Sequence, residues 1–240
     1  MNRYDYSSKI KMGNIGMGAR LGIVEAMDIF QNAVMEHTKF LELDFESMLK
    51  KYNAKWVIAR ARFELDGTLV MGDDYTVSTW PLKAGPLRFE RVFKITSGQK
   101  DIVNSLTEWC VIDADTNAVI RSNKIDFPVR DYLTDRGILG KFSATKLETT
   151  EKDEVYSRKM RASDLDFNNH VNNISYIKLA LDCFSSAELL ALNIKSFEMY
   201  YLTQCFEGDT ITLYKKEHEN GWYVEAKCGD RPVFRCTVNL

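Results

Sequence analysis

The most unusual stretch of this sequence is a run of polar residues that precedes an apolar segment. Residues 163–173 read Ser-Asp-Leu-Asp-Phe-Asn-Asn-His-Val-Asn-Asn. Asp166, Asn168 and His170 alternate along the chain, so they face the same way if this loop is extended. They supply a charged acceptor, an amide that donates or accepts, and a titratable imidazole. Such a set can orient a water molecule, take its proton and pass that proton on, as hydrolysis requires.

The segment that follows the polar run has the spacing of a helix. Its apolar stripe consists of Val171, Ile174, Ile177, Leu181 and Phe184. Backbone N–H groups at the start of a helix lack partners inside the helix and lie near a partial positive charge. We therefore predict that the N–H groups of Val171 and Asn172 stabilise an oxyanion.

Two other interpretations of the polar run stay open at this point. Asn and Asp are favoured helix caps and turn residues, so the run can be purely structural, although a single cap needs only one of them. A metal site is less favoured because one His and two carboxylates leave a soft metal short of ligands. We expect neither a metal nor an organic cofactor.

Most of the remaining sequence predicts short strands rich in aromatic and β-branched residues. They are expected at 56–65, 75–80, 88–95, 105–112, 119–122, 156–162, 196–202, 210–215, 222–228 and 233–238. Several are separated by turns of Gly, Asp and Asn, which favour antiparallel neighbours. A second helical stripe precedes the first group of strands and consists of Ile23, Met27, Phe30, Val34 and His37.

The order of these elements repeats, which indicates a duplicated α+β fold. Gly72-Asp73 and Gly208-Asp209 open corresponding strands in the two halves. Where the second half carries the polar run, the first half reads Met-Gly-Asn-Ile-Gly-Met-Gly-Ala-Arg at residues 12–20, without His or Asp. We predict a first domain at 1–125, a charged connector at 126–153 and a second domain at 154–240, with the site in the second.

Composition excludes several classes of protein. Hydrophobic residues make up 45% and charged residues 28%, and the net charge is −2, so the chain is globular and has no global attraction for nucleic acid. No apolar run is long enough for a membrane span, and the first residues resemble no targeting signal, so we expect a cytoplasmic protein. The five cysteines include no CxxC pair, which argues against zinc or a disulfide framework. His37 and His218 are interpreted as structural.

These residues resemble the acyl-acyl-carrier-protein (acyl-ACP) thioesterases of bacteria and plants, which have a double hotdog fold. The run from Asp166 to Asn173, followed by Tyr176-Ile177, looks like the catalytic signature of that family. Further similar stretches surround Trp56, Thr79-Trp80, Arg91-Val-Phe-Lys-Ile and Trp109. The resemblance covers about Tyr6 to Val238. It implies a tandem hotdog in which each half wraps a helix in a curved sheet, and hydrolysis of fatty acyl-ACP to free fatty acid.

The resemblance also implies site residues, with one departure. Asp166, Asn168 and His170 match the family's active-site positions, but its Glu-Cys pair is here Gln204-Cys205. Gln can position water or donate to an oxyanion, but it cannot act as a carboxylate base. A Cys205 nucleophile is the rival mechanism. It is less favoured because it needs a lowered thiol pKa and a nearby base.

The substrate is expected to be an acyl chain on an acidic carrier protein, with no nucleic-acid or membrane partner and a monomer or homodimer as the assembly. Met27, Phe30 and Val34 are predicted to line the acyl slot, with core packing as the alternative. Candidate carrier contacts are Arg130, Arg136, Lys141 and Lys146. An acyl-CoA thioesterase, a non-catalytic acyl-binding protein and a dehydratase are the alternative functions.

Overall fold

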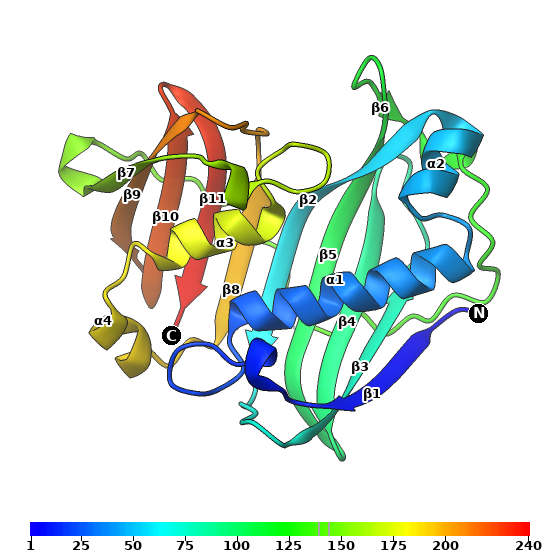
Figure 1. Ribbon diagram of the computed structural model, residues 1–240, viewed down its shortest axis with the longest axis horizontal. Coiled ribbons are helices and arrows are strands. Elements are labelled where there is room, and N and C mark those ends of the chain that lie inside the picture. The colour runs from blue at the N-terminus through cyan, green and yellow to red at the C-terminus, as the bar shows by residue number, and fades with distance from the viewer. Residues whose placement is uncertain (139, 144) are drawn as a thin grey trace. The chain divides into compact units, whose positions relative to one another are not determined.

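Antiparallel pairing, which the short turns predict, holds for each sheet of this chain. The computed structural model describes residues 1–138, 140–143 and 145–240 (Figure 1). The chain divides into two units, Met1–Lys141 and Phe142–Leu240. This division falls inside the predicted connector at 126–153, of which residues 139 and 144 lie outside the described residues. Each unit is described by itself.

The sheet of the N-terminal unit has the strand order β1-β3-β4-β5-β2, with a short β6 beside β5. Its strands are β1 (Tyr4–Lys9), β2 (Ala54–Leu65), β3 (Asp74–Pro81), β4 (Phe89–Ser97), β5 (Lys100–Asp113) and β6 (Val119–Ile120). Strands β2 to β6 were predicted. An entry strand before the first helix was expected, but no residue range was predicted for β1, because six mostly exposed residues at a sheet edge carry little apolar alternation.

The C-terminal unit repeats this topology, with the order β7-β9-β10-β11-β8. Its strands are β7 (Glu154–Lys159), β8 (Ser196–Tyr201), β9 (Thr210–His218), β10 (Gly221–Cys228) and β11 (Arg231–Asn239). Counted within each unit, both sheets run first, third, fourth, fifth, second. The predicted repeat of elements is therefore confirmed at the level of strand topology.

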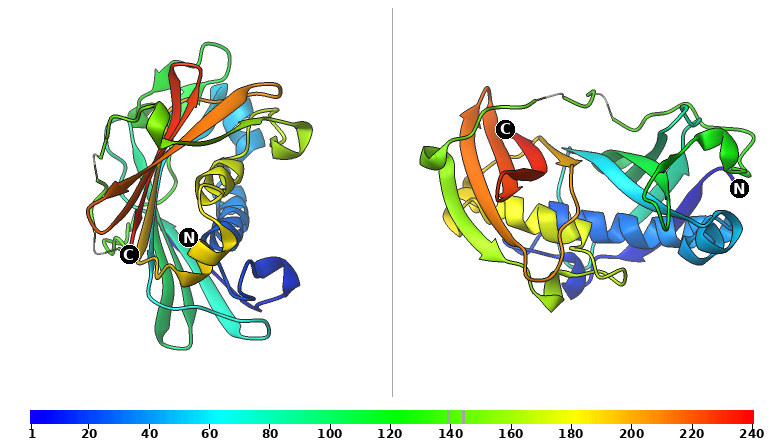
Figure 2. Two further views of the ribbon diagram at one scale, coloured as in Figure 1. Left: turned by 90° about the vertical axis from the view of Figure 1, so that its left-hand side faces the viewer. Right: turned by 90° about the horizontal axis from the view of Figure 1, so that it is seen from above.

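Helix α1 (Ile23–Phe40) lies along one face of the N-terminal sheet (Figures 1 and 2). Met27, Phe30 and His37 of its predicted stripe are buried, and Val34 is half-buried. The Phe30 ring stacks on Phe93 of β4 at a centroid distance of 4.8 Å. The 3.6-residue period thus placed the correct face of this helix against the sheet.

The second predicted helix is shorter than its apolar stripe. Helix α3 (Asn173–Leu181) excludes Val171 and Phe184, although both are buried. After a turn at 182–184, helix α4 (Ser186–Ala191) begins with a capping box formed by Ser185 and Glu188. Helix α2 (Phe45–Tyr52), capped by the Asp44 carboxylate, was also missed. Apolar spacing cannot separate one helix from a helix that is followed by packed turns.

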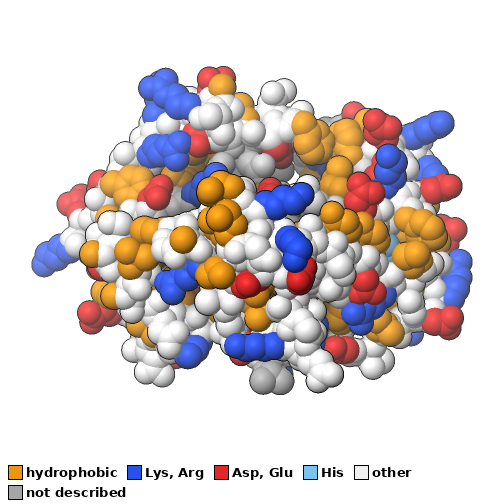
Figure 3. Space-filling view, turned by 60° about the horizontal axis from the view of Figure 1, so that its bottom comes forward, with side chains coloured by type: hydrophobic (Ala, Val, Ile, Leu, Met, Phe, Trp, Pro, Cys, Tyr) orange, Lys and Arg blue, Asp and Glu red, His pale blue; other side chains and the backbone are white. Residues whose placement is uncertain are grey.

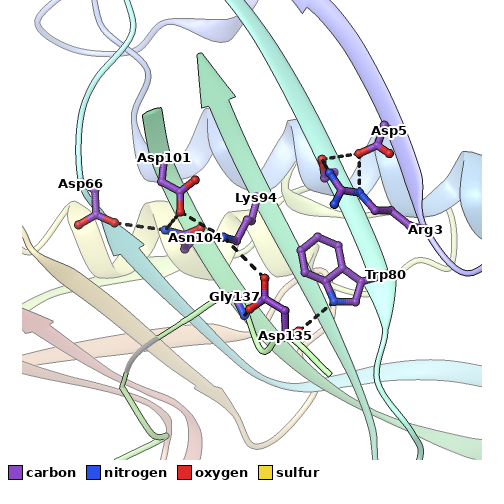
Figure 4. A network of polar contacts seen from close by, with 10 residues as sticks. Arg3, Asp5, Asp66, Trp80, Lys94, Asp101, Asn104, Asp135 and Gly137 are labelled. Atoms are coloured by element: carbon purple, nitrogen blue, oxygen red, sulfur yellow. Dashed lines mark hydrogen bonds and ion pairs between the residues drawn. The ribbon is translucent and has the colours of Figure 1, made fainter. Parts of the chain in front are cut away.

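Part of the connector packs on the face of the N-terminal sheet that lies opposite α1. Trp80 Nε1 donates to the Asp135 carbonyl at 2.9 Å, and Lys94 Nζ lies 3.8 Å from the Asp135 carboxylate (Figure 4). A Cβ on Gly137 would lie 2.3 Å from Val92 Cγ1 of β4, so the connector backbone touches the sheet directly. This stretch is therefore part of the N-terminal unit and not a free linker.

Candidate active site

The polar run forms a tight loop before α3, closed by its own backbone. Asp166 N donates to the His170 carbonyl at 2.8 Å, and Leu165 and Val171 form an isolated antiparallel bridge. Asn169, at the tip, has a φ of 59°, a left-handed conformation that Asn tolerates better than most residues. The loop is thus a turn and not the extended segment that the alternation suggested.

The Asp166 carboxylate organises this loop through one of its two oxygens. Its Oδ1 accepts from the backbone N of Asn168 at 2.8 Å and from that of His170 at 3.3 Å. Oδ2 makes no hydrogen bond with any residue that the structure describes. The side-chain amide of Asn168 and the ring nitrogens of His170 are likewise without partners among the described residues, and all three side chains are half-buried. Three polar groups therefore keep hydrogen-bonding capacity for a ligand or water.

The predicted oxyanion donors are wrong in this structure. Val171 N donates to the Cys205 carbonyl at 2.9 Å, and Asn172 N donates to the Asp164 carbonyl at 2.9 Å. Both N–H groups are therefore occupied by backbone acceptors. The Asn172 side chain caps α3 instead, because its Oδ1 accepts from Ile174 N at 2.9 Å.

Asp164 is a structural residue that the sequence did not distinguish from its neighbours. It is buried, and its Oδ1 accepts from Arg158 Nη2 at 2.6 Å while Oδ2 accepts from Arg161 N at 2.9 Å. Its carbonyl also accepts from Ser175 Oγ of α3 at 3.0 Å. Asp164 therefore ties the loop to strand β7 and to the first turn of α3.

Residues 204–206 lie beside this loop. Besides the bond from Val171, Cys205 donates its backbone N–H to the Tyr176 hydroxyl at 2.9 Å. The His170 ring meets the Phe206 ring edge-on at a centroid distance of 5.1 Å. The structure thus brings the segment that carries Gln204, which is exposed, next to His170. Tyr176 was noted in the sequence as part of the family resemblance. Its hydrogen bond to the backbone of Cys205 could not be predicted from the sequence.

The Cys205 thiol is a poor nucleophile in this environment. Its side chain is buried, and burial is the main reason why its pKa rises to about 11. At neutral pH it is a protonated thiol, whereas nucleophilic attack requires the thiolate. The structure therefore argues against the rival mechanism through Cys205.

The N-terminal unit contains the same loop with different side chains. Gly16 N donates to the Arg20 carbonyl at 2.9 Å, which matches the bond from Asp166 to His170. Ala19 has a φ of 55°, close to that of Asn169. The loop of the N-terminal unit therefore forms although it lacks the Asp, Asn and His of the polar run.

Three neighbouring contacts follow the same correspondence. Leu21 N donates to the Leu69 carbonyl at 2.8 Å, as Val171 does to Cys205. Lys11 N donates to Asn14 Oδ1 at 3.1 Å, as Arg161 does to Asp164. Gly72 and Gly208 have φ values of 94° and 91°, and each donates to the residue after its unit's first strand, Ile10 or Met160. The two loops therefore share these backbone contacts.

This equivalence bears on the structural interpretation of the polar run. Gly16, Gly18 and Arg20 occupy the positions of Asp166, Asn168 and His170, yet the loop keeps its backbone hydrogen bonds. Capping and turn formation therefore do not require an Asp, an Asn and a His at these positions. A chemical role for Asp166, Asn168 and His170 stays a prediction.

The predicted acyl-slot residues belong to the interior of the N-terminal unit. Met27 and Phe30 are buried, and Phe30 also stacks on Phe63 at a centroid distance of 6.1 Å. These contacts give Phe30 a packing role. Lining a slot for an acyl chain stays a prediction for all three residues, Val34 included.

His37 and Arg91 form a buried polar pair inside the same unit. Arg91 Nη1 donates to His37 Nδ1 at 3.0 Å and to Thr79 Oγ1 at 3.2 Å. Burial, followed by the charge of Arg91, lowers the pKa of His37 to about 4, so its imidazole is neutral at pH 7. Burial also lowers the pKa of Arg91 to about 9, which leaves its guanidinium charged.

The remaining candidates lie at a hairpin turn or in the connector. His218 sits at the β9–β10 hairpin, with Nε2 3.9 Å from Glu219, as expected for a turn residue. Arg136 forms two hydrogen bonds of 2.9 Å with Glu90, and Arg130 lies 3.4 Å from Asp126. Lys141 and Lys146 are exposed. The two arginines are thus neutralised by acidic neighbours, which weakens them as contacts for an acidic carrier.

A polar cavity of about 310 Å³ opens beyond the end of α1 in the N-terminal unit. It is lined by Met1, Phe40, Leu41, Glu42, Lys51, Tyr52, Asp126 and Pro128. Within the described part of the chain, no cluster of His, Cys, Asp or Glu is arranged to hold a metal ion. None of the described helices is long and apolar enough to cross a bilayer.

Comparisons with known sequences match both halves of the chain. Residues 1–124 match the acyl-ACP thioesterase N-terminal domain, and residues 147–229 match the corresponding C-terminal domain. The chloroplastic acyl-[acyl-carrier-protein] hydrolase FATB3 of Cuphea viscosissima is 26% identical over 237 residues, covering 90% of this chain and 57% of that protein. A chloroplastic palmitoyl-acyl carrier protein thioesterase of Arabidopsis thaliana is 25% identical, covering 82% of this chain and 50% of its own length. The chain thus spans about half the length of these relatives.

Solved structures show the same fold. An acyl-ACP thioesterase from Bacteroides thetaiotaomicron superposes with a TM-score of 0.87 at 24% identity, covering 99% of this chain and 97% of that one. The 12:0-ACP thioesterase from Umbellularia californica gives a TM-score of 0.85 at 15% identity, covering 100% and 97%. Together with the repeated sheet topology, these similarities identify an α+β tandem hotdog, as predicted.

Proposed function

This chain belongs to the acyl-ACP thioesterase family, and on that premise we propose that it hydrolyses the thioester of fatty acyl-ACP and releases free fatty acid. The observation that carries the proposal is the pair of equivalent loops. The loop before α1 carries Gly16, Gly18 and Arg20 at these positions, with the Glu25 carboxylate of α1 packed against Gly16. The loop before α3 instead presents Asp166, Asn168 and His170 with hydrogen-bonding capacity to spare.

In the proposed reaction, water adds to the thioester carbonyl. Asp166 Oδ2 accepts a hydrogen bond from this water, and His170 takes its proton as the new C–O bond forms. The Asn168 amide donates to the carbonyl oxygen as it becomes an oxyanion. When the C–S bond breaks, His170 returns the proton to the departing thiolate, which yields one carboxylic acid and one thiol.

This assignment replaces the backbone donors expected from the sequence. The backbone N–H groups of Val171 and Asn172 donate to the carbonyls of Cys205 and Asp164. The side-chain amide of Asn168 is therefore proposed as the hydrogen-bond donor to the oxyanion. Gln204, next to the His170–Phe206 contact, is proposed as a second group that positions the water. An amide cannot remove a proton from water, so Gln204 is not assigned as the base.

A non-catalytic acyl-binding protein is the second candidate, and Gln204 favours it. If the reaction needed a carboxylate at position 204, this chain would bind acyl groups without cleaving them. The same site would then retain substrate affinity but show no turnover.

Hydrolysis on matched carriers tests the proposal. We expect purified protein to release thiol from acyl-ACP of at least one chain length, with a kcat/KM at least about tenfold above that for the matching acyl-CoA, because docking of the carrier adds binding energy. Equal rates on both carriers would reassign the substrate to acyl-CoA. Tight acyl binding without thiol release from either carrier would establish the binding protein.

Carrier docking is proposed to rely on local contacts. On the face shown in Figure 3, Lys and Arg side chains are interspersed with Asp and Glu, so no continuous basic patch covers it. Lys141 and Lys146 are the exposed connector residues proposed to meet an acidic carrier.

A further inference from the structure

Arg91 is a buried cation without an acidic partner. It is only 6% exposed, and no carboxylate of a described residue lies within ion-pair distance of its guanidinium. Nη1 donates to two neutral acceptors, His37 Nδ1 and Thr79 Oγ1. Its other N–H groups make no hydrogen bond with any residue in the described ranges. Burying a charge in this way is costly unless something else supplies the missing acceptor.

His37 adds a second unused donor beside Arg91. Because Nδ1 accepts from an arginine, the hydrogen of the neutral imidazole must lie on Nε2. Nε2 is buried and makes no hydrogen bond with a described residue. The Met1 backbone raises the pKa of the ring, but burial and the charge of Arg91 outweigh this and keep the ring neutral. The pair thus presents only donors, one cationic and one neutral, which suits an acceptor oxygen and not another cation.

Along β4, aromatic side chains flank Arg91 on both sides. Phe93, Arg91 and Phe89 alternate on the face of β4 that lies under α1. Phe93 stacks on Phe30, and Phe89 packs edge-on against Trp56 at 4.9 Å. A ligand that reaches Arg91 must therefore have a mostly apolar body as well as an acceptor oxygen.

We propose that His37 and Arg91 form a specificity site that binds an acceptor oxygen, a hydroxyl or a carboxylate, on the distal part of the acyl chain. This inference rests on the proposed function only in taking the apolar body to be an acyl chain. His37 lies seven residues after Phe30, about 10 Å along α1, so the site is at the far end of the predicted stripe. An unsubstituted chain that reaches this point leaves the donors without an acceptor, whereas an oxygenated chain satisfies them.

Binding of non-hydrolysable acyl-pantetheine analogues, in which a thioether replaces the thioester, tests this inference without requiring turnover. The probes are pairs of equal chain length, an unsubstituted chain against its ω-hydroxy or ω-carboxy counterpart, which displace a fluorescent analogue from the full chain. For at least one length, we expect wild-type protein to bind an oxygenated member about tenfold or more tightly than the plain one. Arg91→Met and His37→Phe should bring this ratio close to one.

Matched variants separate specificity from folding. Arg91→Lys keeps the charge and should retain part of the preference if Arg91→Met proves unstable. Lys94→Met, on the opposite face of β4, should leave the ratio unchanged. Ratios near one across the wild-type panel, or ratios that survive both Arg91→Met and His37→Phe, would overturn the proposal. Hydrolysis of plain acyl-ACP, measured in parallel, reports on the proposed function separately.

Discussion

His170→Ala is expected to lower kcat/KM for acyl-ACP hydrolysis by about 10²- to 10⁴-fold, the range for loss of a general acid–base group. In the proposed reaction, His170 both takes the proton from water and returns it to the thiolate. The ring is half-buried, and its neighbour in space is Phe206, so its removal leaves the backbone contacts of the loop in place. Initial rates of thiol release over a range of substrate concentrations measure the effect.

Two controls separate catalysis from folding in the His170 experiment. His218→Ala removes a half-buried histidine at the β9–β10 hairpin, outside the candidate site, and should leave kcat/KM within about twofold. Far-ultraviolet circular dichroism of His170→Ala should match the wild type, because the loop of the N-terminal unit forms with Arg20 at this position. Near wild-type turnover by a folded His170→Ala protein would remove His170 from the mechanism.

Phe30→Ala is expected to reduce the free energy of unfolding by about 3–5 kcal/mol, the range for deleting a buried aromatic side chain. Phe30 is 1% exposed and stacks on Phe63 and Phe93, so its loss opens a cavity between α1 and the sheet. Urea denaturation followed by circular dichroism gives the value. Because the chain has two units, each transition must be assigned before it is analysed.

Val34→Ala provides the matched comparison for Phe30. Val34 is on the same stripe of α1 but only half-buried, so its truncation should cost about 1 kcal/mol or less. If Phe30→Ala instead left stability unchanged and shifted the preferred chain length, Phe30 would be a wall of the acyl slot and not part of the core.

The fold was largely predictable from the sequence because two local signals agreed. Strands such as β2 and β10 combine β-branched or aromatic residues with turn residues at their ends, and α1 has an uninterrupted stripe. The ends of α3 and the position of β1 were not predicted, because packing against other parts of the fold determines them. Val171 and Phe184 are buried by packing outside α3, and β1 is held by pairing with β3 and not by its own pattern.

In the candidate site, the residue types could be predicted from the sequence, but their hydrogen-bond partners could not. Residue types alone singled out Asp166, Asn168 and His170, and the equivalent loop at 12–20 shows that the backbone does not need them. The donors Val171 and Asn172 were predicted wrongly because their acceptors, Cys205 and Asp164, come into reach only through the fold. Arg91 and His37, separated by 54 positions, could not be paired from spacing.

The central claim is that water, held by the loop before α3, cleaves an acyl thioester. The most direct measurement is incubation of the protein with acyl-ACP in water enriched in the heavy oxygen isotope, followed by mass spectrometry of the lipid product and quantification of free thiol. The account predicts a free fatty acid that carries one labelled oxygen, formed in equal amount with the thiol. An acyl group that stays intact on its carrier, with no thiol released, would contradict it.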